Sequence, residues 1–186
     1  MKKKFLALVL TLAMVLSLVP MTALAEEPAP VAQIEGATYS SIDEAIERAE
    51  AGATIELLQD VTATKTFSKS LKFTGGHAIN FNVYGWRYEG DLVLDGARLN
   101  IINDESSRQA DNGEAGRWFT MCLTGSITAK NEAGISFVID SDSGATCAIY
   151  MDEHARAMMI NVESGSRFSI TGENTEGTGG KGIELG

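Results

Sequence analysis

The sequence is poor in the residues that most often build a reactive or cross-linked site. Its 186 residues include two cysteines and two histidines. Two cysteines do not make the disulfide framework of a small secreted domain, and His77 and His154 are too few for a metal site with imidazole ligands. The chain has no G-x-S-x-G esterase motif, and Gly180-Lys181 is followed by glycine instead of the Ser or Thr of a P-loop. We therefore expect neither nucleotide binding nor esterase chemistry of these kinds.

Positive charge is also scarce. The chain has 15 Lys+Arg against 25 Asp+Glu, a net charge of −10. Residues 1–25 contain three of the lysines and no acid, so the net charge of the remainder is −13. Nucleic-acid binding needs a basic surface to neutralise phosphates. We therefore expect no nucleic-acid partner.

The first 25 residues have the pattern of a secretory signal peptide. Three lysines precede an apolar run over residues 5–19, and Ala23-Leu24-Ala25 forms an A-x-A cleavage site. The run is shorter than the ~20 apolar residues of a membrane-spanning helix. We expect cleavage after Ala25, export to the extracellular space, and no transmembrane span in the mature chain. Residues 26–36, which begin with a Pro/Ala-rich stretch, are expected to form a disordered tether.

A short amphipathic helix is predicted between Ser41 and Gly52. Ser41 and Glu44 have capping-box spacing, which satisfies free backbone amides at a helix start. Apolar residues recur at i, i+3, i+4 and i+7, giving one stripe of Ile42, Ala45, Ile46 and Ala49. Gly52 is expected to end the helix, because glycine adopts the left-handed C′ conformation without a Cβ penalty.

Residues 39–57 resemble the N-terminal entry of right-handed parallel β-helix proteins of the pectate-lyase-like group, where such a helix caps one end of the fold. The matching residues are Tyr39, Ser41, Ile42, Ala45, Ile46, Ala49, Gly52, Thr54, Ile55 and Leu57. The resemblance implies an all-β, single-stranded right-handed parallel β-helix over residues 37–186, similar to adhesin-like bacterial surface proteins. It implies no particular activity, because this cap occurs on lyases, hydrolases and non-enzymatic proteins alike.

The rest of the chain predicts short strands separated by Gly, Asn, Asp and Ser. We expect strands at residues 54–58, 70–73, 79–83, 92–94, 99–102, 119–123, 126–129, 136–139, 147–151, 159–162, 168–171 and 182–185. No second helical pattern appears after Gly52, so a doubly wound α/β fold is not expected. The alternative to a β-helix is a β-sandwich. Weak self-similarity around Ile127 and Ile170, 43 positions apart, favours the β-helix by suggesting two repeats of a solenoid.

The last residues, 182–186, read as a strand that is only beginning. We therefore expect the chain to be the N-terminal portion of a longer surface protein, truncated at its C-terminus. Association with a cell wall would then depend on the missing regions.

Cys122 and Cys147 lie 25 positions apart, about one turn of such a solenoid. Stacked on neighbouring strands, their Cα atoms would be ~4.8 Å apart, a separation that a disulfide tolerates. The alternative is a ladder of two buried thiols, because cysteine packs as a small hydrophobic residue.

Two pairs of carboxylates are candidate calcium ligands. Asp91 and Asp95 bracket one predicted strand, and Asp140 and Asp142 lie two apart on another. Calcium takes six to eight oxygen ligands. Carboxylates at turns are also expected by chance in so acidic a chain, and no Lys or Arg at a characteristic spacing identifies a catalytic base.

Aromatic residues provide the candidate ligand-binding surface. Tyr84, Trp86 and Tyr88 alternate in the sequence, and Trp118 follows further on. Facing outward, these rings would form a platform for stacking on sugars, since exposed aromatic patches mark interaction sites. The alternative is that they are core residues.

From these patterns we expect a secreted or cell-surface, adhesin-like module that is not an enzyme. It would act as a binding module or a stalk and would face a polysaccharide or cell-surface glycan. The alternative is a calcium-assisted polysaccharide lyase or glycoside hydrolase on the same fold. Calcium is the one cofactor that the sequence suggests.

Overall fold

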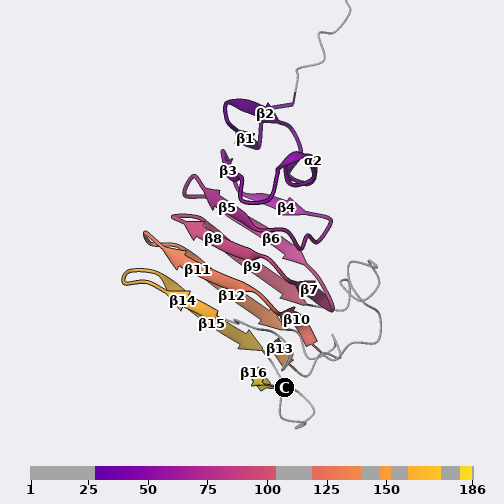
Figure 1. The fold of residues 1–186 in the computed structure, drawn as a ribbon, viewed down its shortest axis with the longest axis vertical. Helices are drawn as coiled ribbons and strands as arrows, with labels where there is room; N and C mark the ends of the chain where they lie inside the picture. Colours follow the sequence, from indigo (N-terminus) through magenta and orange to yellow (C-terminus); the bar gives the residue numbers. More distant parts are fainter. Residues whose placement is uncertain (1–27, 104–118, 140–146, 152–158, 173–180, 186) are drawn as a thin grey trace, which may run out of the picture.

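The protein is mostly β, with one short helix near the start of the described chain (Figure 1). The computed structural model describes residues 28–103, 119–139, 147–151, 159–172 and 181–185. The all-β class predicted from the sequence is confirmed at this level. Within the described part, no helix is long and apolar enough to cross a membrane.

The strands form three sheets. The seven-stranded sheet contains, in spatial order, β14 (Met159–Val162), β11 (Ser126–Lys130), β8 (Asp91–Asp95), β5 (Leu71–Thr74), β3 (Thr54–Leu57), β1 (Ala32–Ile34) and β2 (Ala37–Tyr39). The five-stranded sheet contains β15 (Arg167–Gly172), β12 (Gly134–Ile139), β9 (Arg98–Asn103), β6 (Ala78–Asn82) and β4 (Val61–Ala63). The four-stranded sheet contains β16 (Lys181–Leu185), β13 (Cys147–Met151), β10 (Phe119–Leu123) and β7 (Trp86–Tyr88).

From β5 onward, consecutive strands belong to different sheets, and each strand pairs in parallel with the strand three elements later. Thus β5 pairs with β8, β6 with β9 and β7 with β10. Antiparallel pairing occurs only where β1 meets β2 and β3, among the described strands. Parallel neighbours need a long crossover connection, and here that connection passes through the other two sheets.

The number of residues between paired positions is not constant. Thr54 pairs with Lys72, 18 positions on, whereas Gly134 pairs with Arg98, 36 positions back. The self-similarity noted around Ile127 and Ile170 is therefore not a structural repeat. Ile127 pairs with Ile160 in the seven-stranded sheet, and Ile170 pairs with Phe137 in the five-stranded sheet.

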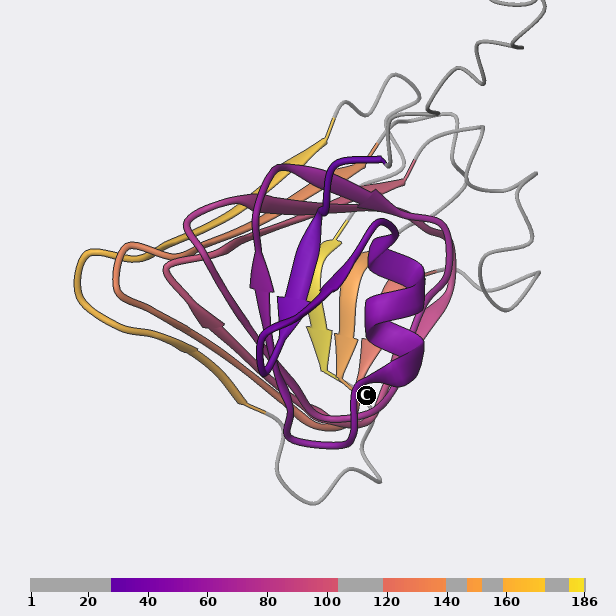
Figure 2. The ribbon, with the colours of Figure 1, turned by 90° about the horizontal axis from the view of Figure 1, so that it is seen from above.

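The predicted helix is present as α2 (Ile42–Arg48), and it covers one end of the three sheets (Figure 2). Its buried stripe joins the main core together with residues of all three sheets. Ser41 is the N-cap, and its Oγ accepts a hydrogen bond from the Glu44 N–H at 3.5 Å. The helix C-cap is Ala49, not a glycine, and Lys69 Nζ donates to the Ala49 carbonyl at 2.5 Å. Gly52, with φ +85°, instead makes the turn into β3.

The expectation that residues 26–36 form a disordered tether is wrong for the second half of this segment. Residues 32–34 form β1, which pairs with β2 and β3, and Ala32 is fully buried. The burial of this apolar residue and the backbone pairing outweigh the disorder suggested by the neighbouring prolines. The short strands β4 and β7 were also missed, because three residues are too few to show alternation.

Close packing at the turns supports a test with a matched control. A Cβ at Gly125 would overlap the Gly90 carbonyl oxygen, whereas a Cβ at Gly134 would meet only the flexible Arg98 side chain, 3.5 Å from its Cγ. We predict that Gly125→Ala lowers the free energy of unfolding by about 1–3 kcal/mol, the usual cost of overpacking. Gly134→Ala should be neutral or slightly stabilising, because alanine loses less backbone entropy. Urea unfolding of both variants checks this, and equal midpoints would contradict the packing argument.

Candidate binding surface

The aromatic platform predicted from the sequence does not form, because two of its rings point into the core. Trp86 and Tyr88 are 1% and 0% exposed. They lie opposite Met121 and Leu123 of β10, and both pack with Phe67 edge-on. Two residues that alternate on one strand share a face, and here that face is the buried one.

The polar ends of these buried rings find partners on a neighbouring loop. Trp86 Nε1 donates to the Phe67 carbonyl at 2.7 Å, and the Tyr88 hydroxyl donates to the Lys69 carbonyl at 3.2 Å. Burial raises the pKa of the Tyr88 hydroxyl, with a smaller contribution from the Asp91 carboxylate. Tyr84 is half-buried, and Trp118 lies outside the described residues.

The structure does not bring Asp91 and Asp95 together as calcium ligands. They stand at opposite ends of β8, four residues and therefore ~13 Å apart along an extended strand. Asp91 Oδ1 accepts a hydrogen bond from the Ser126 hydroxyl at 2.6 Å. Asp140 and Asp142 lie outside the described residues. In the part of the chain that the structure describes, no three Asp, Glu, His or Cys residues gather to hold a metal ion.

The Asp95 carboxylate belongs to an ionic network on the outer side of the seven-stranded sheet. Its Oδ2 lies 2.7 Å from Lys72 Nζ and 3.6 Å from Lys130 Nζ, and Asn131 Nδ2 donates to its Oδ1 at 2.5 Å. The hydrogen bonds from Lys72 and Asn131, with the charges of both lysines, lower the Asp95 pKa to about 2. This carboxylate therefore neutralises neighbouring lysines and is poorly placed to bind a free cation.

The predicted stacking of Cys122 on Cys147 is wrong. The register places Cys122 opposite Tyr150 and Cys147 opposite Phe119, because paired residues of β10 and β13 are 28 positions apart and not 25. The structure does not join the two sulfur atoms in a disulfide. Both side chains are fully buried and pack with Phe119 in a small cluster apart from the main core. The Cys147 thiol donates to the Ile149 carbonyl at 2.9 Å.

The sequence analysis missed a line of neutral polar residues across the outer face of the five-stranded sheet. One residue from each strand stands in the same register position, and we call the set the polar column: Thr62, Asn80, Asn100, Ser136 and Ser169. Each is at least partly exposed, while the residues on either side in the sequence are mostly buried. With strands ~4.8 Å apart, the column is ~19 Å long.

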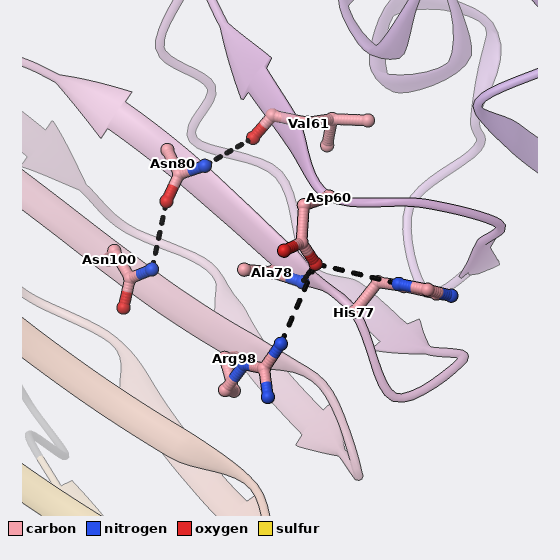
Figure 3. Close-up of polar contacts among 7 residues, drawn as sticks. All are labelled: Asp60, Val61, His77, Ala78, Asn80, Arg98 and Asn100. Atoms are coloured by element: carbon pink, nitrogen blue, oxygen red, sulfur yellow. Dashed lines mark hydrogen bonds and ion pairs between the residues drawn. The ribbon is translucent and has the colours of Figure 1, made fainter.

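The first part of the polar column is fixed by side-chain amides (Figure 3). Asn80 Nδ2 donates to the Val61 carbonyl at 2.9 Å, and Asn100 Nδ2 donates to Asn80 Oδ1 at 2.8 Å. Figure 3 shows the Asn100 carbonyl oxygen pointing away from Asn80. The chain of amides thus ends in an acceptor, followed along the column by the hydroxyls of Ser136 and Ser169.

A charged cluster lies beside this column at the starts of the same strands (Figure 3). Asp60 Oδ1 accepts from the Ala78 N–H at 2.8 Å and lies 3.5 Å from both His77 Nδ1 and Arg98 Nη2. The Asp60 pKa is lowered, chiefly by the Ala78 hydrogen bond; desolvation opposes this, and the Arg98 and His77 groups lower the pKa further. These side chains are 42–61% exposed, so water screens their attraction and the ion pairs contribute little to stability.

Comparison with known proteins adds no relative. The sequence matches no family model, no curated protein and no solved structure.

The Asp95 network predicts a defined pH dependence of stability. The folded-state pKa of Asp95 lies below the usual ~3.9 of an unfolded Asp, so its stabilisation is present above pH ~4 and is lost as pH falls towards 2. We predict that Asp95→Asn is less stable than the unsubstituted protein at pH 6 and that the difference shrinks between pH 4 and 2. Thermal unfolding across this range measures the difference in stability. Lys72→Met is expected to narrow the pH range over which Asp95 changes the stability. A stability difference between Asp95→Asn and the unsubstituted protein that stays constant from pH 5 to 2 would rule out this role of the Asp95 carboxylate.

Proposed function

We propose that the protein is a secreted or cell-surface, single-stranded right-handed parallel β-helix that acts as a non-enzymatic binding or stalk module. The parallel pairing of each strand with the strand three elements later supports the β-helix, since one turn of such a fold would contribute one strand to each of three sheets. The α2 helix across one end supports it further, because a strand stack needs a terminal cap. The signal-peptide pattern of residues 1–25 supports export.

The polar column is the observation that carries the binding function. Its amides and hydroxyls both donate and accept hydrogen bonds, and a glycan offers hydroxyls with the same double capacity. The groups are neutral, so binding does not desolvate an ion. They are also held on a sheet whose backbone is already ordered, which lowers the entropy cost of recognition. We therefore place the glycan-facing surface on this column and not on the buried Trp86 and Tyr88.

A calcium-assisted lyase or glycosidase is the competing function. It would need several carboxylates around one ion with a base close by. The separation of Asp91 from Asp95 and the lysine pairing of Asp95 favour the binding module. The polysaccharide-binding experiment described next, carried out with and without calcium, distinguishes the two functions.

We predict that the mature domain binds a soluble polysaccharide through the five-stranded sheet. Ser136→Glu places a longer, charged side chain in the middle of the polar column, and we expect it to weaken binding about tenfold or more, equivalent to ~1.4 kcal/mol. Thr128→Glu is the matched control, because Thr128 faces outward on the neighbouring β11 in the seven-stranded sheet. Affinity electrophoresis against neutral and acidic polysaccharides, with and without calcium, provides the measurement.

Two results would overturn this assignment. Equal weakening by both variants would remove the polar column as the binding surface. Ultraviolet absorbance of an unsaturated sugar product that appears with calcium and disappears with a chelator would show that the protein is a lyase.

A further inference from the structure

The five-stranded sheet carries positive charge in a protein that is acidic as a whole. Its strands β4, β6, β9, β12 and β15 contain no Asp or Glu, and their charged residues are Arg98 and Arg167. The strands of the seven-stranded sheet, by contrast, contain three acidic residues and two lysines. In a chain of net charge −10, an anion therefore meets weaker repulsion over the strands of the five-stranded sheet.

The two arginines stand at the same register position on the outer face, with a glycine between them. Gly134 of β12 pairs with Arg98 of β9 on one side and with Arg167 of β15 on the other. The arginine Cα atoms are therefore two strand spacings, ~9.6 Å, apart. The atoms nearest to a Cβ built at Gly134 belong to the Arg98 side chain, the first at 3.5 Å. The space between the arginines thus contains no side chain of β12.

The two guanidinium groups differ in how far they are already engaged. Figure 3 shows Arg98 directed towards Asp60, and its Nη2 lies 3.5 Å from Asp60 Oδ1. Both of these side chains are more than half exposed, so their ion pair is weak and screened by water. Arg167 is exposed and forms no ion pair with any acidic residue that the structure describes. Glu132 and Glu163 stand in the turns that precede β12 and β15. Among these described groups, an incoming anion would displace one weak ion pair.

We propose that the glycan bound by the polar column carries a sulfate or phosphate ester, and that Arg98 and Arg167 bind this group above Gly134. This inference rests on the proposed binding function and names the class of ligand for it. Gly134 precedes Ser136 of the polar column by two residues, about 7 Å along β12. A sugar whose hydroxyls contact the column therefore places a substituent between the arginines.

The arrangement of the two arginines favours an ester oxyanion over a carboxylate. Either ester has three terminal oxygens in a tetrahedral arrangement, so it accepts hydrogen bonds from guanidinium groups on opposite sides. A carboxylate is planar and has two oxygens, which a single bidentate guanidinium can bind. Arginine also presents a fixed fork of donors that matches such anions, which lysine does not.

Dextran, carboxymethyl dextran, dextran sulfate and dextran phosphate provide a matched series of probes on one neutral backbone. We expect the mature chain to bind the sulfate or the phosphate form about tenfold more tightly than the carboxymethyl form, and to lose affinity as salt is added. The ester that binds more tightly identifies which of the two chemistries the site prefers. Isothermal titration calorimetry at low ionic strength gives the dissociation constants.

Substitution of the arginines tests the site directly. Arg98→Gln and Arg167→Gln should each raise the dissociation constant for the preferred ester by roughly 5- to 30-fold, because each removes charged hydrogen bonds to the ligand. Arg48→Gln is the matched control, since it removes the same charge from an exposed position on α2. It should change the constant by less than about twofold, because a distant exposed charge is screened.

The outcomes separate this inference from the binding function on which it rests. The ester site is overturned if neither ester binds more tightly than neutral or carboxymethyl dextran, or if Arg167→Gln and Arg48→Gln weaken binding equally. Ser136→Val removes a hydroxyl from the polar column without changing charge. If the arginine variants weaken binding of the ester and Ser136→Val does not, the arginine site stands and the polar column is overturned as the binding surface.

Discussion

Parallel backbone pairing between strands three elements apart is the constraint on which the rest of the structure depends. Once β6, β9, β12 and β15 are in register, Ile79, Leu99, Ile135 and Phe168 form one inward row. A slip of one residue would turn every such row outward. The same register that builds the core also aligns the polar column on the opposite face. Core and candidate binding surface are therefore two consequences of one pairing pattern.

The local structure could be predicted because it depends on neighbouring residues. Alternation in Leu71-Lys72-Phe73 predicts a strand with one buried face, and β5 is such a strand. The cap and apolar stripe around Ser41 and Ile42 likewise predict α2. β1 was not predicted because prolines precede it in the sequence. It forms by pairing with β2 and β3. Pairing with distant segments is information that a local pattern does not contain.

The site could not be predicted for the same reason. The distance in sequence between paired residues changes along the chain, so equal spacing does not mean spatial proximity. Cys122 and Cys147 miss each other by three positions, whereas Asn80 and Asn100 stand side by side at a spacing of 20. Alternation correctly groups Trp86 with Tyr88 on one face. Only their pairing with Met121 and Leu123 determines that this face is the interior.

The apolar inner face of the sheets is covered to different extents along the described chain. At one end, α2 supplies an apolar stripe, and its own unpaired groups are satisfied locally by Ser41 and Lys69. A helix ends the pairing because it offers no strand edge to a neighbour. At the other end, β14, β15 and β16 are the last described strands of their sheets, and Ile160, Phe168 and Ile170 on their inner faces are only partly buried. Because apolar burial drives the packing, the helix-covered end contributes more stability per residue than these strands do.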